Sequence, residues 1–144
     1  NIDDLLGHPV SDNELVTYGQ WWENKLGING GFYKFKSGSL KFVWDRFAEN
    51  PEFWQMYYYN QGVVHYKYYG EQNYVYQCML DKDVKITTTP GEWLYKHTDR
   101  FDEKLELERL YCKKFNTDYA IMGDVNKYIK VIHYAGPGKT INGL

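Results

Sequence analysis

The chain has 144 residues and a formal net charge of −2, with no block of like charges. This length supports a single sizeable hydrophobic core, which excludes two independent catalytic domains. The charge balance argues against a nucleic-acid partner, because such partners select clustered Lys and Arg. No apolar run approaches the ~20 residues that cross a bilayer, and no charged segment with an apolar run after it opens the sequence. We therefore expect a soluble protein without a membrane span, and the cysteine usage favours a cytoplasmic one.

Aromatic residues make up 19% of the chain, with 15 Tyr and 5 Trp. These side chains combine an apolar ring with a polar group, which suits sugar rings, subunit interfaces and cores equally well. A Tyr-rich surface is therefore compatible with homo-oligomer formation. The two cysteines, Cys78 and Cys112, have no C-x-x-C spacing, so we expect reduced thiols and neither a zinc site nor a disulfide framework.

The first half of the chain predicts two strands followed by two helices. Residues 14–18 and 31–35 are β-prone, and small glycines precede the second run, for positive φ or for the close approach of a ligand. Ser39 is a candidate N-cap for an amphipathic helix over 40–50. Pro51 suits the first turn of a second helix that runs to residue 60.

The second half alternates helical and extended patterns. A helix is predicted to begin at or near Glu71 and Gln72, because Tyr74, Val75, Cys78 and Met79 share one helical face. The remaining expectations are a strand over 84–88, a turn at 90–91, an extended return over 92–97, a helix over 100–116 and a strand over 128–134. Strands separated by helices predict an α/β or mixed α+β domain, with a mixed sheet and flanking helices, spanning 1–144 as a single domain.

The run "IKVIHYAGPGKT" at 129–140 places His133 at the end of a strand, before Gly136, Gly138 and Lys139. A neutral imidazole can bind a divalent cation, while a glycine turn and a lysine can hold a phosphate. A surface turn with a hydrogen-bonded histidine would produce the same pattern.

Two other segments have a functional and a structural interpretation. In "INGGF", Asn29 can donate and accept hydrogen bonds, and Gly30 and Gly31 allow a ligand to approach the backbone, although an ordinary turn before a strand fits as well. In "GEQN", Glu71 and Gln72 fall at a predicted helix start, where capping alone explains them.

Taken in order, "NIDDLL", "INGGF", "GEQN" and "KVIHYAGPGK" resemble the second half of glycogenin-like glycosyltransferases, which have the GT-A fold. In that family an N-I-D-D-L segment follows a metal-binding D-x-D, an N-[SA]-G opens a strand, and G-D-Q begins a helix. A K-V-x-H-[FY]-x-G-x-x-K run comes last. The resemblance covers nearly the whole chain.

The resemblance implies transfer of a sugar from a nucleotide-diphosphate sugar to a glycan, protein or small-molecule acceptor, with retention of configuration. His133 would bind Mn²⁺ or Mg²⁺, and Gly136, Gly138 and Lys139 would hold the donor diphosphate. Asn29 would contact the donor or acceptor sugar, and Asn29, Gly30 and Gly31 are counted among the donor-binding residues. Gln72 would lie beside the anomeric carbon, with Glu71 next to it.

The chain departs from the family at Glu71, which replaces Asp, and at Thr140 and Ile141, which replace Pro-Trp. The family's D-x-D and nucleotide-binding strands precede the N-I-D-D-L segment, so we expect them upstream of residue 1. One metal ligand is too few for a hard divalent ion. The 144 residues alone are therefore expected to be an inactive C-terminal part of a glycosyltransferase.

Two alternatives remain. One is a non-catalytic glycan-binding or assembly module on the same fold, located in the virion or host cytoplasm if the source is viral. The other is an unrelated metal-independent enzyme centred on His65 or His97.

Overall fold

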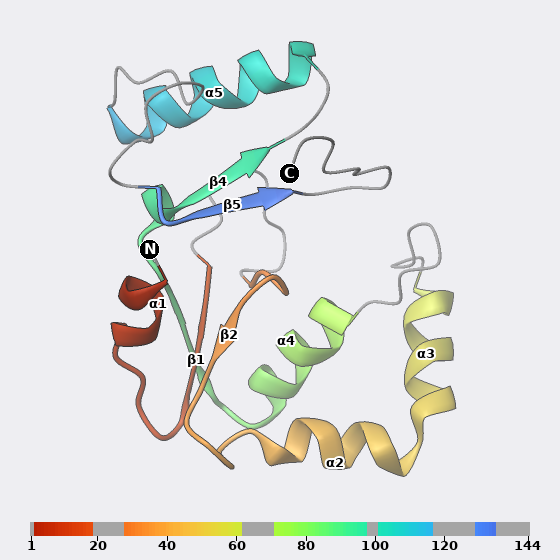
Figure 1. Ribbon diagram of the computed structural model, residues 1–144. Helices are drawn as coiled ribbons and strands as arrows, with labels where there is room; N and C mark the ends of the chain where they lie inside the picture. The colour runs from red at the N-terminus through yellow and green to blue at the C-terminus, as the bar shows by residue number, and fades with distance from the viewer. Residues whose placement is uncertain (1, 19–27, 62–70, 98–100, 117–128, 135–144) are drawn as a thin grey trace. The chain divides into compact units, whose positions relative to one another are not determined.

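The computed structural model describes residues 2–18, 28–61, 71–97, 101–116 and 129–134 (Figure 1). The described elements are helices and two small sheets, so the chain is mixed α/β, as the sequence predicts. It divides into two compact units. The central unit is assembled from Pro9–Tyr18 and Asn24–Thr88, and the terminal unit from Asn1–His8, Gly19–Glu23 and Thr89–Leu144.

The central unit contains a three-stranded mixed sheet of order β2-β1-β3. Strand β1 (Glu14–Thr17) pairs antiparallel with β2 (Tyr33–Lys34) and parallel with β3 (Lys85–Thr88). All four β1 residues are buried, as is typical of the middle strand of a covered sheet. The predicted strands at 14–18 and 84–88 are confirmed, and the one predicted at 31–35 is reduced to two residues.

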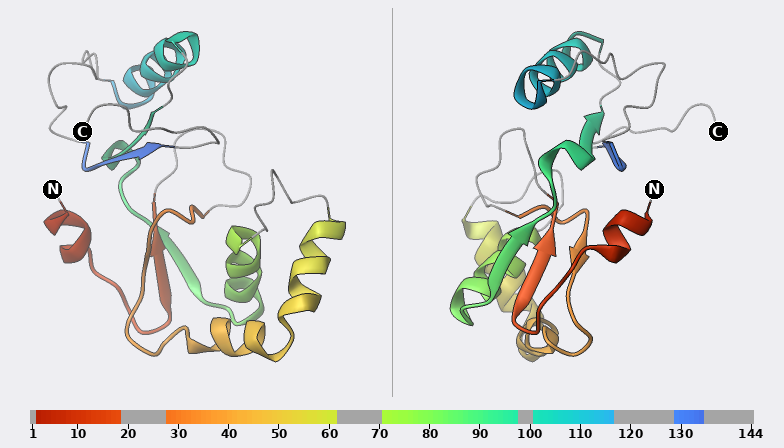
Figure 2. Two further views of the ribbon diagram at one scale, coloured as in Figure 1. Left: turned by 45° about the vertical axis from the view of Figure 1, so that its right-hand side comes forward. Right: turned by 90° about the vertical axis from the view of Figure 1, so that its left-hand side faces the viewer.

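Three helices, α2 (Lys41–Glu49), α3 (Pro51–Asn60) and α4 (Glu71–Asp81), gather beside this sheet (Figure 2). Pro51 occupies the first turn of α3, and Asn50 caps that helix by accepting a hydrogen bond from Phe53 N at 3.1 Å. The predicted N-cap role of Ser39 is wrong. Its hydroxyl donates to Lys36 O at 2.8 Å within a turn, and the N-cap of α2 is Leu40, which has no side-chain cap bond.

The core of the central unit lies between the sheet and the helices. The predicted face of α4 is confirmed, since Tyr74, Val75, Cys78 and Met79 are all buried. They pack with Leu15, Ile28, Leu40, Tyr58 and Val84. Arg46 of α2 contacts both other helices. Its guanidinium lies 4.4 Å from the centre of the Trp54 ring in α3 and 2.6 Å from Asp81 Oδ2 in α4.

The terminal unit pairs β4 (Leu94–His97) with β5 (Val131–Tyr134) in parallel, and α5 (Phe101–Phe115) lies between them in the sequence. Its other helices are α1 (Asp3–Gly7) and the short 3-10 helix η1 (Gly91–Trp93). Its core contains Tyr95, Leu107 and Tyr111, and Tyr111 Oη donates to Glu92 O at 2.5 Å.

Cys78 and Cys112 are both free thiols, in agreement with the expectation of no disulfide. Across the described residues, no helix is both long enough and apolar enough to span a bilayer.

Candidate functional site

The loop at residues 28–31 is anchored to the sheet by Thr17. The Thr17 hydroxyl donates to Asn29 O at 2.8 Å and accepts from Asn29 N at 3.0 Å, and both residues are buried. Asn29 Oδ1 then accepts from Gly31 N at 2.9 Å, which closes the turn. The side-chain oxygen of Asn29 therefore shapes the loop. Its predicted contact with a sugar stays a prediction.

The same loop is bonded to the start of α4. Gly30 N donates to Gln72 Oε1 at 2.8 Å, although the two residues are 42 positions apart in the sequence. This bond fixes the orientation of the Gln72 amide, because the oxygen is the atom that faces Gly30. Within the described residues, no hydrogen bond is formed by the amide nitrogen of Gln72. The structure thus brings together two of the segments that the sequence singles out.

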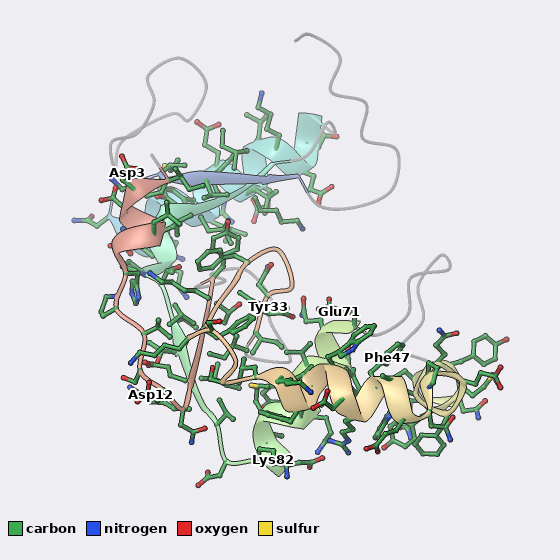
Figure 3. The ribbon with its side chains drawn as sticks, turned by 60° about the horizontal axis from the view of Figure 1, so that its bottom comes forward. Asp3, Asp12, Tyr33, Phe47, Glu71 and Lys82 are labelled. Carbon is green, nitrogen blue, oxygen red and sulfur yellow. The ribbon has the colours of Figure 1, made fainter. Side chains whose placement is uncertain are left out.

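Three side-chain oxygens converge above the α carbon of Gly30. A β carbon placed there would lie 2.9 Å from Glu71 Oε2, 3.4 Å from Tyr33 Oη and 3.5 Å from Gln72 Oε1. Gly30 is not a positive-φ glycine; among the described glycines only Gly38 is. Glycine is needed at this position because another group comes too close for a β carbon. That group is the Glu71 side chain, and not a ligand as the sequence suggests. We call this space the Gly30 niche, bounded by Gly30, Tyr33, Glu71 and Gln72. Figure 3 labels two of these residues, Tyr33 and Glu71.

Tyr33 and Glu71 influence each other's protonation. Burial and the nearby Glu71 charge raise the pKa of Tyr33 well above its usual range, so its hydroxyl remains protonated wherever a carboxyl group titrates. Burial also raises the pKa of Glu71, and the Tyr33 hydroxyl opposes that shift. The two groups are close, but the Tyr33 hydroxyl forms no hydrogen bond of normal geometry within the described part of the chain.

A cavity of about 450 Å³ lies beside the Gly30 niche, within the central unit. Tyr33 and Glu71 belong to both. Its wall is almost wholly apolar and rich in aromatic rings, and the remaining residues that line it are Leu15, Phe35, Leu40, Val43, Trp44, Phe47, Trp54, Gln55, Tyr58, Tyr74 and Val75. An apolar or aromatic group fits such a wall, whereas a bare sugar would leave its hydroxyls without partners.

The other predicted site residues lie outside the described residues or in the terminal unit. Gly136, Gly138 and Lys139 fall outside the described residues, and so does His65. The backbones of His133 and His97 lie in β5 and β4 of the terminal unit. Over the described ranges, no group of three or more His, Cys, Asp or Glu residues could hold a metal ion. The Mn²⁺ or Mg²⁺ site and the diphosphate contacts stay predictions.

Two residues of this site, Thr17 and Tyr33, are not predicted from the sequence. Thr17 looks like any β-branched residue in a strand, because nothing local shows that its hydroxyl reaches Asn29. Tyr33 is one of many tyrosines, and only the register of β2, where Tyr33 pairs with Thr17, places it near the start of α4.

No protein-family model, curated protein or solved structure matches this chain. The contacts of its own residues are therefore the structural basis for a functional proposal.

Proposed function

We propose that this chain forms the acceptor-side part of a nucleotide-sugar-dependent glycosyltransferase of the GT-A type. The observation that carries the proposal is the hydrogen bond from Gly30 N to Gln72 Oε1 at 2.8 Å. It joins the "INGG" and "GEQ" segments, which the glycogenin-like family would use to surround one sugar. An ordinary turn and an ordinary helix start would not require the two segments to meet.

The reaction would be substitution at the anomeric carbon of the donor sugar. A bond forms from an acceptor oxygen to that carbon, the bond from the carbon to the diphosphate oxygen breaks with its electron pair, and the acceptor proton leaves with the diphosphate or to solvent. In this scheme the amide nitrogen of Gln72 donates to a sugar oxygen, because its carbonyl oxygen is engaged by Gly30. His133 remains the residue of this chain predicted to bind a divalent ion, whose chemistry would be charge neutralisation on a diphosphate.

Glu71 is the ionisable group at this position. Burial beside Tyr33 raises the pKa of its carboxyl group, which makes it a candidate for contact with a sugar hydroxyl. It also borders the apolar cavity, so an acceptor could place an apolar part there and a hydroxyl at the carboxylate.

The test is a transfer assay on the longest chain that the gene encodes around these residues, with a panel of nucleotide-diphosphate sugars and Mn²⁺. We expect release of nucleoside diphosphate, and a loss of about 100-fold or more in kcat for Gln72→Ala and for Glu71→Gln. Gln77→Ala is the matched control, because Gln77 lies on the same helix and, within the described part of the chain, donates to Asp81 alone, at 2.7 Å. Equal activity in Gln72→Ala and Gln77→Ala would contradict the assigned site.

A second candidate function, binding without catalysis, is favoured by the cavity alone. Its aromatic wall could hold an apolar group of a partner whether or not any sugar is transferred. This candidate predicts no divalent-dependent release of nucleoside diphosphate by the longest encoded chain with any donor of the panel. It also predicts that Gln72→Ala leaves partner binding unchanged.

A further inference from the structure

The position of Tyr33 is set by the sheet and not by its own hydroxyl. Its backbone pairs with Thr17 in the β1–β2 register, and Thr17 also holds both backbone groups of Asn29. One buried residue of the central strand therefore fixes the tyrosine and the glycine loop together. This arrangement brings Tyr33 Oη to the edge of the Gly30 niche, opposite the first turn of α4.

The hydroxyl of Tyr33 is enclosed and makes no hydrogen bond of normal geometry among the described residues, although it lies close enough to the Glu71 carboxylate to lower the pKa of that group. An enclosed phenol without such a bond costs stability, so its position calls for a specific explanation. The Glu71 carboxylate is the acidic group beside it, and the two oxygens lie within 2.9 and 3.4 Å of the same point above Gly30. Contacts of this kind are often loose before a ligand binds and tighten in the complex.

We propose that Tyr33 is a positioning residue for Glu71, donating its hydroxyl to the carboxylate and holding it over Gly30. This inference rests on the proposed function, in which Glu71 faces the reacting sugar. Tyr33 itself need not touch the substrate. It would act by limiting the rotation of a flexible carboxylate at a helix start, where a displacement of about 1 Å can cost about 100-fold in rate.

Gly30 is the second half of this arrangement. A β carbon there would approach Glu71 Oε2 to 2.9 Å, which no ordinary contact allows. The carboxylate is the end of a flexible side chain, so Gly30→Ala would push it aside without breaking the loop. Gly30 thus provides the space in which Tyr33 holds Glu71.

The groups that face Glu71 come from two directions. From β2, Tyr33 lies against it and opposes the rise in its pKa. From α3 and α4, Tyr58 and Tyr74 line the same cavity, but neither perturbs the pKa of Glu71. Within the described part of the chain, Tyr33 is therefore the one titratable group whose removal should change the titration of Glu71.

The experiment is a ¹³C NMR titration of the 144-residue chain labelled with [5-¹³C]glutamate, with the Glu71 signal assigned from Glu71→Gln. Tyr33→Phe should raise the pKa of Glu71 above its wild-type value, because the ionised carboxylate loses a hydrogen-bond donor. Tyr58→Phe is the matched control. Tyr58 also has an enclosed hydroxyl without a partner, and burial raises its pKa to about 12, but Glu71 is not among the groups that perturb it.

Gly30→Ala is the second variant, with Gly7→Ala as its control, because a β carbon at Gly7 meets nothing within 4 Å. Gly30→Ala should change the chemical shift of the Glu71 carboxyl carbon. In the Gly30→Ala background, Tyr33→Phe should then have a smaller effect on the Glu71 titration. Amide spectra of each variant verify that the fold is retained. A Glu71 titration that is the same in wild type, Tyr33→Phe and Tyr58→Phe would overturn the proposal.

The outcome is separable from that of the proposed function. An upward shift in Tyr33→Phe together with no sugar transfer would retain the positioning role and reject the transferase. In an active protein, Tyr33→Phe should lower kcat about 10-fold with little change in KM and move the limb of the pH–rate profile that reports Glu71. Transfer that is insensitive to Tyr33→Phe at every pH would overturn the positioning role and leave the transferase in place.

Discussion

Thr17→Val tests the hydroxyl that anchors the glycine loop. Valine retains the shape of threonine and its preference for a strand, so the change leaves no cavity and removes only the hydroxyl. Thr17 is 0% exposed and Asn29 is 5% exposed, and the hydroxyl makes bonds of 2.8 and 3.0 Å to the backbone of Asn29. The variant should therefore bury an N–H group and a carbonyl without that shared partner.

The expected cost follows from those two groups. An unsatisfied buried backbone group costs about 1–3 kcal/mol. Part of this cost is offset, because the variant no longer has a polar hydroxyl to bury. We expect the free energy of unfolding to fall by about 2–4 kcal/mol. Stability of about 0.05–0.15 kcal/mol per residue makes this a large part of the total.

Urea denaturation followed by tryptophan fluorescence and by far-UV circular dichroism measures the change, with coincident transitions as the condition for a single free energy. Thr88→Val is the matched control, because Thr88 is the exposed Cα partner of Thr17 on β3. The control should remain within about 0.5 kcal/mol of wild type. A Thr17→Val cost no larger than that of the control would refute the anchoring role and, with it, the account of how the loop is placed.

Three further predictions concern the central unit. The pKa of Glu14 is lowered to about 2 from 4.5, chiefly by the Thr87 hydroxyl. Its stabilisation is therefore complete above pH 4.5 and lost as the pH falls toward 2, and Glu14→Gln should flatten the pH dependence of the urea midpoint in that window. Tyr74→Phe removes the bond of 2.8 Å to Val43 O and should cost about 1–2 kcal/mol in the same assay. Gln72→Ala should speed hydrogen exchange of the Gly30 amide and cost about 0.5–1.5 kcal/mol, since Gly30 N loses its acceptor.

Each of these changes has a control variant. The control makes the same kind of substitution at a residue that lacks the contact under test. Glu49→Gln, which neutralises an exposed carboxyl, is the control for Glu14→Gln. An acid-side slope in Glu14→Gln identical to that in Glu49→Gln would show that Glu14 is not responsible. Tyr57→Phe removes an exposed hydroxyl, so it should be close to neutral. Gln77→Ala should leave the Gly30 amide as protected as in wild type, and equal protection in Gln72→Ala would contradict the Gly30–Gln72 bond.

The fold was predictable where the signal lies within one element. The buried face of α4, formed by Tyr74, Val75, Cys78 and Met79, follows from spacing inside a single helix, and Pro51 marks the start of α3 by its fixed φ. Ser39 shows the limit of such local rules. A serine before an apolar helix suits an N-cap, but here its hydroxyl bonds back to Lys36 O in the preceding turn.

The site was only partly predictable, because it depends on contacts between distant segments. Asn29 to Gly31 and Glu71 to Gln72 stand out as short motifs, and the structure shows that they meet. Thr17 and Tyr33 do not stand out, since their roles arise from strand register and from the turn at Asn29. Periodicity carries no information about which side-chain oxygens converge over Gly30.

The central claim is that a nucleotide sugar binds at the loop of Gly30 and Gly31. The most direct measurement is a titration of the longest encoded chain, labelled with [¹⁵N]glycine, with nucleotide-diphosphate sugars and Mg²⁺. Of the 13 glycine amides in these 144 residues, those of Gly30 and Gly31 should shift and saturate, while those of Gly7 and Gly38 stay in place. Saturable binding that leaves the Gly30 and Gly31 amides unmoved, or no binding of any donor, would contradict the claim.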